Sequence, residues 1–271
     1  MNEPTSNRAA PAAKSSRLAK GIVFLIAFSL IGCGVWLVEA VKDAREAARH
    51  SQCRGHFGQL HLALHNYHEK YNCFPPAFMT DENGKPKHSW RVLILEFFSS
   101  EELAVYKQYD FNEPWDGPNN RTLANRINRR IFQCPSGPNY ERSPMTDYVA
   151  VVGSQTAFPG SQCTSLSDFR DGPENTILLV EIANSKIHWM EPRDLKFDEM
   201  SFVVNDLTKP SISSSHPRGP VALFTASVHS WTLDGALRPE TLKAMTTIAG
   251  GEVVSMEKLI QQSPNDRFLA E

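Results

Sequence analysis

The hydrophobic pattern begins with a long apolar run. Residues 21–38 (GIVFLIAFSLIGCGVWLV) are eighteen positions without a charged side chain. As a helix this run is about 27 Å long, close to the hydrocarbon thickness of a bilayer. Residues 39–71 contain no proline and are rich in Ala, Leu, Glu, Arg and Gln, which favour helix. The pattern predicts one long helix, half in lipid and half soluble, that ends before Pro75 and Pro76.

In the soluble half of this helix the apolar residues recur at helical spacing. At 100° per residue they fall within a stripe about 80° wide, so one face of the helix is predicted to pack against the rest of the chain. The stripe contains Cys53, Phe57, Leu60, Leu64, Tyr67 and Tyr71.

Beyond Pro76 the pattern predicts short helices. Ser89 is a candidate cap for a helix over 90–98, and Ser99 or Ser100 for a second helix that ends near Gln108. Residues 110–120 (DFNEPWDGPNN) have turn chemistry throughout. The remaining predicted helices cover residues 121–130, the segment from Arg238 to Gly250-Gly251, which has proline at the first helical position, and residues 257–262.

Strand-like runs follow in the second half of the chain. They cover residues 147–152, 176–182, 220–225 and 228–233, the last two as a predicted hairpin. A long helix first and strands later, without βαβ alternation, predicts an α+β fold with an antiparallel sheet.

The predicted organisation has five parts. They are a disordered cytoplasmic tail (1–20), a transmembrane helix (21–41), its soluble continuation (42–73), a globular domain (74–253) and a C-terminal helix and tail (254–271).

Charge gives the predicted orientation of the chain in the membrane. Four Lys or Arg residues lie in the segment 1–20 and three, Lys42, Arg45 and Arg49, follow the span. A short basic tail before the first span favours a cytoplasmic N-terminus. The alternative is a cleaved secretory signal, but Val38-Glu39-Ala40 is a poor small-residue cleavage site.

Composition argues against nucleic acid as a partner. The formal net charge is −2, and no like-charge run exceeds a few residues. The sequence also lacks a glycine-rich phosphate loop and a dinucleotide fingerprint.

Four stretches of the chain carry a resemblance to a known family, the pseudopilin-like family of planctomycetes and relatives (domain-of-unknown-function family 1559). The resemblance implies a pilin-like fold, in which the N-terminal helix is both anchor and spine, and it implies no established activity. The stretches are residues 44–53 (AREAARHSQC) running into 62–76; residues 89–120; residues 132–136 (FQCPS) with 168–175 and 187–200; and residues 216–219 through 249–253.

The N-terminus departs from the pattern of that family. Members typically have a prepilin processing signal, with Gly followed by Phe and Glu at the fifth position of the mature chain. Here Gly21 is followed by Ile22, and the fifth position is Ile26. Since that Glu is thought to direct filament assembly, the chain is expected to keep its tail and to act as a tether.

The C-terminal signature of the family is also incomplete. It consists of a His, nine residues, and Asp-Gly; His216 is present, but Ala226 and Ser227 stand where Asp-Gly is expected. Asp-Gly makes a tight two-residue hairpin turn, whereas Ala-Ser lacks residues that tolerate positive φ. A wider or less stable turn is predicted here, at a cost of about 1 kcal/mol.

The cysteines are candidates for disulfides. Cys33 lies in the apolar run, which leaves four cysteines on one side of the membrane and three possible pairings. Cys53 and Cys134 match the two cysteines that family members typically carry, so the resemblance implies a Cys53–Cys134 bridge, with Cys73–Cys163 as the second pair. The alternative is four buried free thiols.

Two groups of side chains are candidate metal sites. His61, His65 and His68 lie within about 60° on the long helix, and a His pair at i, i+4 can ligate zinc. The alternative is that they hydrogen-bond to the sheet or its loops.

The second group is the loop 110–120, which is rich in oxygen ligands of the kind that calcium prefers. No cofactor is expected otherwise, and turns capped by side chains are the alternative to a calcium site. The candidate ligands are Asp110, Asn112, Asp116 and Asn119.

A last cluster of titratable groups falls in the strand region. Glu181, His188, Arg193 and His216, with Glu191 and Asp194, are candidates for a ligand site or for a buried ion-pair network. A carboxylate–His pair can do acid–base work, but no Gly-x-Ser-x-Gly nucleophile accompanies it.

Together these features predict a non-enzymatic, single-pass protein of the cytoplasmic membrane with a pseudopilin-like domain outside the cytoplasm. It is expected to be a standalone module or a minor pilus- or secretion-type subunit. Its expected partners are the bilayer and other pilin-like subunits. The alternatives are a module that binds a ligand or glycan in the loops 110–120 and 189–194, and a hydrolase.

Overall fold

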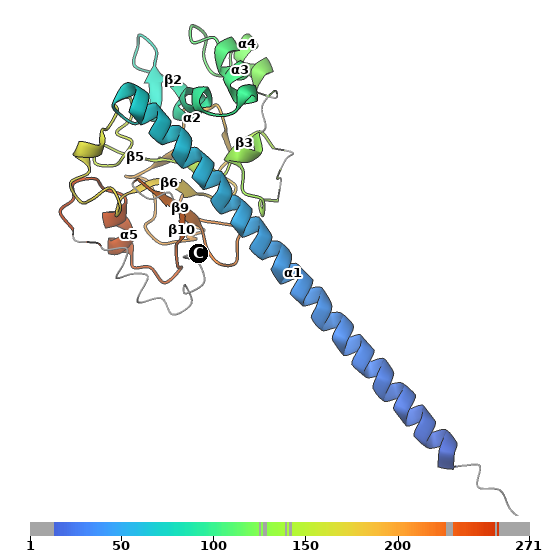
Figure 1. Ribbon diagram of the computed structural model, residues 1–271. Coiled ribbons are helices and arrows are strands. Elements are labelled where there is room, and N and C mark those ends of the chain that lie inside the picture. The colour runs from blue at the N-terminus through green and yellow to red at the C-terminus, as the bar shows by residue number, and fades with distance from the viewer. Residues whose placement is uncertain are drawn as a thin grey trace, which may run out of the picture. The chain divides into compact units, whose positions relative to one another are not determined.

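The computed structural model describes residues 14–124, 126, 129–138, 140, 143–225, 230–252 and 254, without the side chains of residues 14–22, 100 and 129 (Figure 1). The chain divides into two compact units, Met1–Ala48 and Arg49–Glu271. Of the tail predicted over 1–20, residues 14–20 are helical and belong to α1, so the prediction is wrong there. Residues 1–13, the turn at Ala226 and Ser227, and the predicted helix over 257–262 lie outside the described residues.

The predicted long helix is confirmed. Helix α1 runs without interruption from Lys14 to Tyr71 (Figure 1). It ends before the prolines because Asn72 takes the left-handed conformation, with φ at 59°, and donates its backbone N–H to His68 O at 2.7 Å. A residue in this conformation is a common way to end a helix.

The predicted stripe on α1 is buried along most of its length. Cys53, Phe57, Leu60 and Leu64 are fully buried. Tyr67 is half-buried and Tyr71 is exposed, where the helix leaves the core and both rings contact Phe97.

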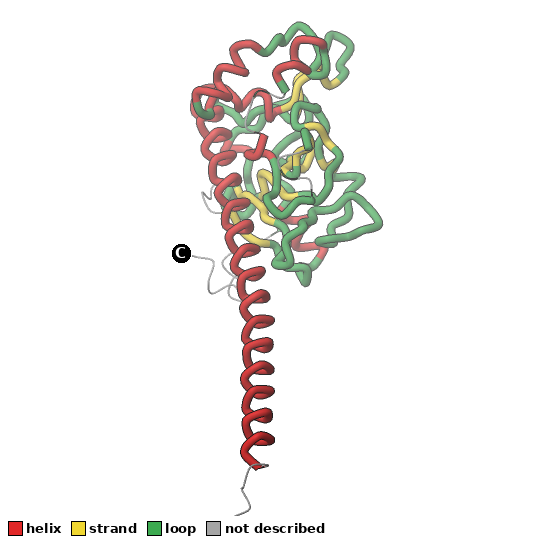
Figure 2. The backbone as a smooth tube through the Cα atoms, turned by 90° about the vertical axis from the view of Figure 1, so that its right-hand side faces the viewer, coloured by secondary structure: helices red, strands yellow, loops and turns green. Residues whose placement is uncertain are grey.

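Short elements separated by long loops make up the rest of the second unit (Figure 2). The predicted helix after Ser89 is confirmed, because Ser89 Oγ accepts the backbone N–H of Arg91 at 3.2 Å. The helical elements are α2 (Trp90–Leu93), the 3-10 turn η1 (Ile94–Phe97), α3 (Ser100–Gln108), α4 (Pro118–Leu123), the 3-10 turns η2 (Arg129–Phe132) and η3 (Leu166–Asp168), and α5 (Pro239–Met245).

Several helix boundaries differ from the predictions. The helix predicted over 90–98 is α-helical only to Leu93 and continues as the turn η1, and the helix predicted over 121–130 ends at Leu123. Helix α4 begins at Pro118, inside the stretch predicted as turns, because proline at the first helical position needs no N–H partner and has a helical φ. Helix α5 ends at Met245, before the glycine pair, and its last turn closes through Thr246 N–H to Lys243 O at 3.0 Å.

The main sheet has four antiparallel strands in the order β10-β9-β6-β4. The predicted hairpin is confirmed, since Ser230 pairs with Leu223 and Thr232 with Val221. Three two-stranded ladders complete the sheets: β1-β2 and β3-β7 are antiparallel, and β5-β8 is parallel. The strands are β1 (Phe78–Thr80), β2 (Pro86–Ser89), β3 (Met145–Thr146), β4 (Tyr148–Val149), β5 (Val151–Val152), β6 (Ile177–Glu181), β7 (Ile187–His188), β8 (Leu195–Lys196), β9 (Val221–Phe224) and β10 (Ser230–Thr232).

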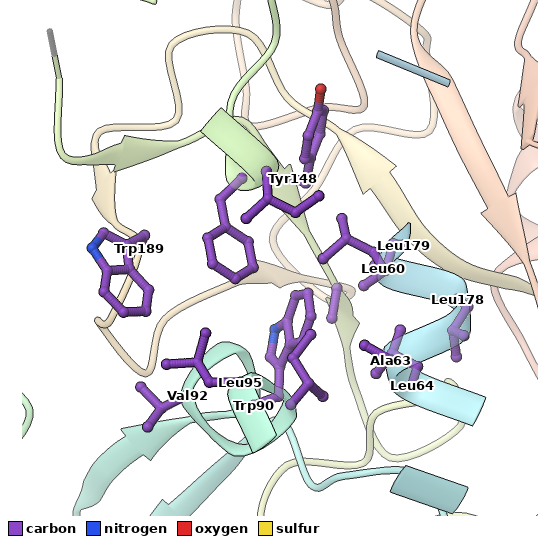
Figure 3. Close-up of a cluster of buried hydrophobic side chains, with 14 of the residues drawn as sticks. Leu60, Ala63, Leu64, Trp90, Val92, Leu95, Tyr148, Leu178, Leu179 and Trp189 are labelled. Carbon is purple, nitrogen blue, oxygen red and sulfur yellow. The ribbon is translucent and has the colours of Figure 1, made fainter. Parts of the chain in front are cut away.

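Both faces of the main sheet are buried. Strand β6 contributes to two hydrophobic clusters: Leu178 and Leu179, at an irregularity of the strand, belong to the cluster of the α1 stripe, whereas Val180 packs with Leu242 and Met245 of α5. Figure 3 shows the α1 side of this core, where Leu60, Ala63 and Leu64 lie beside Leu178 and Leu179. The sheet therefore lies between α1 and α5.

A buried ion pair crosses the first cluster. Arg91 Nη2 lies 2.5 Å from Asp194 Oδ1, and the two side chains are 0% and 1% exposed. Asp194 also accepts the indole N–H of Trp90 and the backbone N–H of Ala150, while Arg91 donates to Tyr148 O. Every charged atom of the pair thus has a partner, which a buried ion pair requires. The bond from Ala150 also explains why the run predicted as one strand over 147–152 divides into β4 and β5.

Replacing Asp194 by Asn is expected to destabilise the protein by about 3–5 kcal/mol, because it leaves the Arg91 charge buried without a counter-ion. Denaturant unfolding of the two full-length chains measures this difference. The control is Glu199→Gln, which breaks the exposed pair Lys196–Glu199 and is expected to change stability by less than about 0.5 kcal/mol. Equal effects of the two substitutions would contradict the assignment.

Candidate functional site

Four side chains with metal-ligating atoms converge between α1 and the main sheet. They are Cys53, Cys134, Glu181 and His216, and their ligand atoms all lie within 4.8 Å of one another. The four residues are between 0% and 3% exposed. We call this group the buried cluster. Among the described residues it is the group of three or more His, Cys, Asp or Glu that converges in this way.

Each member of the buried cluster comes from a different segment. Cys53 belongs to the apolar stripe of α1, and Glu181 is the last residue of β6. Cys134 follows the η2 turn, where its backbone N–H donates to Asp147 Oδ2 at 2.8 Å. His216 lies in the loop before β9, and its backbone N–H donates to Ser214 Oγ at 2.9 Å. Packing of the helix on the sheet brings these four segments together.

Short contacts join the cluster internally. Cys134 Sγ lies 3.2 Å from His216 Nε2. Tyr148 donates its hydroxyl toward Cys53 Sγ at 3.2 Å and toward Gln133 O at 2.9 Å. The Tyr148 hydroxyl has one proton to donate, so the sulfur of Cys53 and the carbonyl of Gln133 share it as acceptors.

One carboxylate oxygen of the cluster has no partner. Glu181 Oε2 accepts the backbone N–H of Val221 at 3.1 Å, whereas the buried Oε1 has no hydrogen-bond partner among the described residues. A buried polar atom without a partner costs free energy, more so when it is charged. The arrangement is therefore incomplete as a purely hydrogen-bonded network.

Titration behaviour separates the two thiols. The contact with Cys53, together with burial, raises the pKa of Cys134. Burial opposes ionisation of Cys53, but hydrogen bonds from Cys134 and His216 outweigh it and lower the pKa of Cys53. Burial also raises the pKa of Glu181.

Histidines surround the buried cluster. The His50 ring meets the His216 ring edge-on, with centroids 4.9 Å apart, and His50 Nε2 lies 3.1 Å from Thr232 Oγ1. His56 Nδ1 lies 3.2 Å from Gln133 O. These contacts fix the orientation of the side chains and carbonyls that face the cluster.

The structure brings both predicted cysteine pairs together. Cys53 lies beside Cys134 in the buried cluster, and Cys73 lies beside Cys163, where burial and the neighbouring thiol raise the pKa of Cys73 to about 12. All these cysteines are free thiols in the structure, as is Cys33. The two disulfides remain predictions.

The predicted histidine trio on α1 contacts backbone groups. His61 and His65 direct their Nε2 atoms at the same oxygen, Thr225 O, at 3.3 and 2.7 Å. His68 Nε2 accepts the backbone N–H of Leu166 at 3.3 Å. These bonds tie the helix to the end of β9 and to a loop, which is the structural alternative; metal binding by the trio remains a prediction.

The predicted calcium loop is organised by its own side chains. Asp110 Oδ1 accepts the backbone and side-chain N–H groups of Asn112, and Asn119 donates to Gln108 O at 3.4 Å. The buried Asn120 links Asp110 and Pro114 through their backbone groups. Asp116 is exposed. Calcium binding here also remains a prediction.

The titratable cluster predicted in the strand region is divided into three parts, one of which is Asp194 in the buried ion pair with Arg91. Glu181 and His216 lie in the buried cluster, whereas His188 stacks near Trp115 with centroids 5.1 Å apart. Arg193 bonds to Glu191 and to Lys186 O at the surface.

Sequence reasoning missed the convergence of Glu181 and His216 on the two cysteines. It also missed Tyr148 as a partner of Cys53. One signal was available: Cys53 lies on the packed stripe, and Glu181 ends the most hydrophobic strand, where a carboxylate is out of place without a partner.

The fold and this site define an α+β protein in which one long N-terminal helix packs on an antiparallel sheet over a buried Cys–His–Glu group. The chain belongs to the family described as "Protein of unknown function (DUF1559)", whose model matches residues 42–243, about three quarters of the chain. This confirms the predicted resemblance. No curated protein and no solved structure matches the chain.

Replacing His61 by Gln is expected to weaken the acid sensitivity of the fold. Burial, together with His65, lowers the pKa of His61 from 6.5 to about 4. Between pH 6.5 and 4 the unfolded chain therefore binds more protons at this residue than the folded chain, so stability falls as pH falls. In the variant, the unfolding free energy should change less steeply with pH, and the difference in slope should correspond to less than one bound proton.

Urea midpoints at intervals from pH 4.5 to 7.5 measure the slope for the wild-type and His61→Gln chains. The value at pH 7.5 gives the pH-independent cost of losing the hydrogen bond to Thr225. Parallel curves for the two proteins would refute the assignment.

Proposed function

We propose that this protein is a non-enzymatic, membrane-anchored envelope protein with a pilin-like domain outside the cytoplasm. The observation that carries the proposal is the apolar segment of α1. It is long and apolar enough to cross a membrane, and none of it is buried in the protein. Its side chains include Phe24, Phe28 and Trp36, each at least 69% exposed. Such a helix needs lipid around it.

The helical part of the second unit supports the pilin-like aspect of the proposal. Residues 49–71 of α1 pack along the sheet through the buried stripe. In this proposal the first part of the helix, apolar on all sides, anchors the protein in the membrane. The second part, apolar on one stripe, is the helix on which the sheet packs. The family match supports the same class, while Ile26 in place of Glu supports a tether over a filament subunit.

Two arginines in the apolar segment are expected to release the protein from the membrane. Leu30→Arg with Ile31→Arg costs roughly 5–7 kcal/mol of insertion free energy at the centre of the span. Carbonate-washed membranes of expressing cells should then lack the variant, whereas they retain the wild-type chain.

The matched control places two arginines at exposed apolar positions of the second unit. Leu62 and Leu207 are 61% and 97% exposed, and the pair Leu62→Arg with Leu207→Arg should remain in the membrane. Retention of the Leu30/Ile31 variant would overturn the anchor. If the mature chain starts at Ile22, the protein is a processed pilin subunit and not a tether.

A pocket favours ligand or glycan binding as a second candidate function. Its volume is about 410 Å³, within the usual range for ligand sites. It lies where the loops 110–120 and 189–194 were predicted to bind, and it is lined by Trp115, Asp116, Arg121, Lys186, His188 and Glu191. Trp189, which lies in the second of these loops, is buried and does not line the pocket.

If this pocket binds glycans, Trp115→Ala should abolish binding of the purified full-length chain to a glycan array, because the aromatic face of the site is lost. The control is Trp231→Ala, a half-buried tryptophan on β10 away from the pocket lining. An array without wild-type binding, or binding that survives Trp115→Ala, would eliminate this candidate.

A further inference from the structure

We propose that Cys53, Cys134, Glu181 and His216 bind one zinc ion that fastens helix α1 to the main sheet. The proposal goes beyond membrane anchoring and does not depend on it. It concerns the buried cluster alone, whose residues all belong to the second unit.

Each donor of the set is a known zinc ligand. Zinc in proteins is bound by thiolates, imidazoles and carboxylates, and structural sites have four ligands, usually cysteines and histidines; here Glu181 takes the place of one of them. The cluster offers two sulfurs, one ring nitrogen and one carboxylate oxygen. Sulfur ligands disfavour calcium and magnesium, which require oxygen, and four mixed S, N and O ligands match a tetrahedral ion.

The spacing of these atoms is close to that of a coordination shell. Zinc bonds of about 2.0–2.3 Å place the ligand atoms of a tetrahedron about 3.3–3.8 Å apart. Here all four atoms lie within 4.8 Å of one another, and Cys134 Sγ and His216 Nε2 are 3.2 Å apart. Side-chain adjustments of about 1 Å or less therefore complete the shell.

Glu181 is the observation that points to a cation. Val221 holds Oε2 by its backbone N–H, while Oε1 is buried and has no hydrogen-bond partner among the described residues. A disulfide between Cys53 and Cys134 would consume both sulfurs and leave this carboxylate oxygen as it is. A bound cation gives the same oxygen a partner and neutralises its charge.

Neighbouring groups orient the proposed ligands. Ligands of structural metals are oriented by hydrogen bonds from neighbouring groups. Tyr148 donates to Cys53 Sγ, and the Cys134 backbone is fixed by Asp147. The ring of His216 rests against that of His50.

The burial of the site assigns it a structural role. A catalytic zinc keeps one position open for water or substrate, whereas all four ligands here are protein side chains that are at most 3% exposed. They come from α1, the turn after η2, the end of β6 and the loop before β9. One ion therefore joins four segments far apart in the sequence, and its binding free energy contributes to folding.

The test measures zinc by mass spectrometry in the full-length chain, purified in detergent without chelator. One zinc per chain is expected. Cys134→Ser and Glu181→Gln should each reduce the content at least tenfold. The matched control, Cys73→Ser with Cys163→Ser, removes the other thiol pair and should keep one zinc per chain, as should His65→Gln in the histidine trio.

A second measurement on the wild-type chain covers the case in which the Cys134 and Glu181 variants fail to fold. Replacing zinc by cobalt(II) should give a thiolate-to-cobalt charge-transfer band and intense visible absorption from a tetrahedral site with sulfur ligands. If the zinc content falls in the His65→Gln variant and stays at one per chain in the Cys134→Ser variant, the proposal is wrong. A metal-free wild-type chain with a Cys53–Cys134 disulfide in peptide mapping would do the same.

Discussion

Burial of one face of α1 against the main sheet is the constraint on which the rest of the structure depends. Cys53, Phe57, Leu60 and Leu64 are completely excluded from water. Each buried side chain of this size contributes about 1.5–3 kcal/mol, so the stripe is a large part of the core. Strand β6 is buried on both faces of the sheet. Because α1 covers one face, α5 packs on the other.

This packing forces polar groups into the interior, and the protein treats two sets of them differently. Arg91 and Asp194 satisfy each other and the backbone groups around them, so the pair needs nothing from outside. The buried cluster has one carboxylate oxygen left over at Glu181. An interior that completes one polar set and leaves another open indicates that the second set has a further partner.

The sequence was sufficient for elements whose pattern is local. The helix over 21–71, the strand β6 and the β9-β10 hairpin each follow from the pattern within one segment, whereas the helical turns over 14–20 were not predicted. The strands β3, β5, β7 and β8 have two residues each, which is too short for a period, and distant partners hold them, as when Leu195 N–H reaches Ala150 O. The buried cluster was missed for the same reason. Its chemistry was visible at Cys53 and Cys134, but only tertiary packing adds Glu181 and His216.

The two hydrophobic patterns of α1 have different surroundings in the structure. Residues 23–38 are apolar all round and lack partners within the protein, whereas Cys53 to Leu64 are apolar on one face and have the sheet. Directional contacts also hold α1 on the sheet: His61 and His65 reach Thr225 O, and His68 accepts the N–H of Leu166. Metal bonds are directional, and Cys53 lies at the first fully buried apolar position of the stripe. The proposed ion at that position would add a directional link about two helical turns before these histidines.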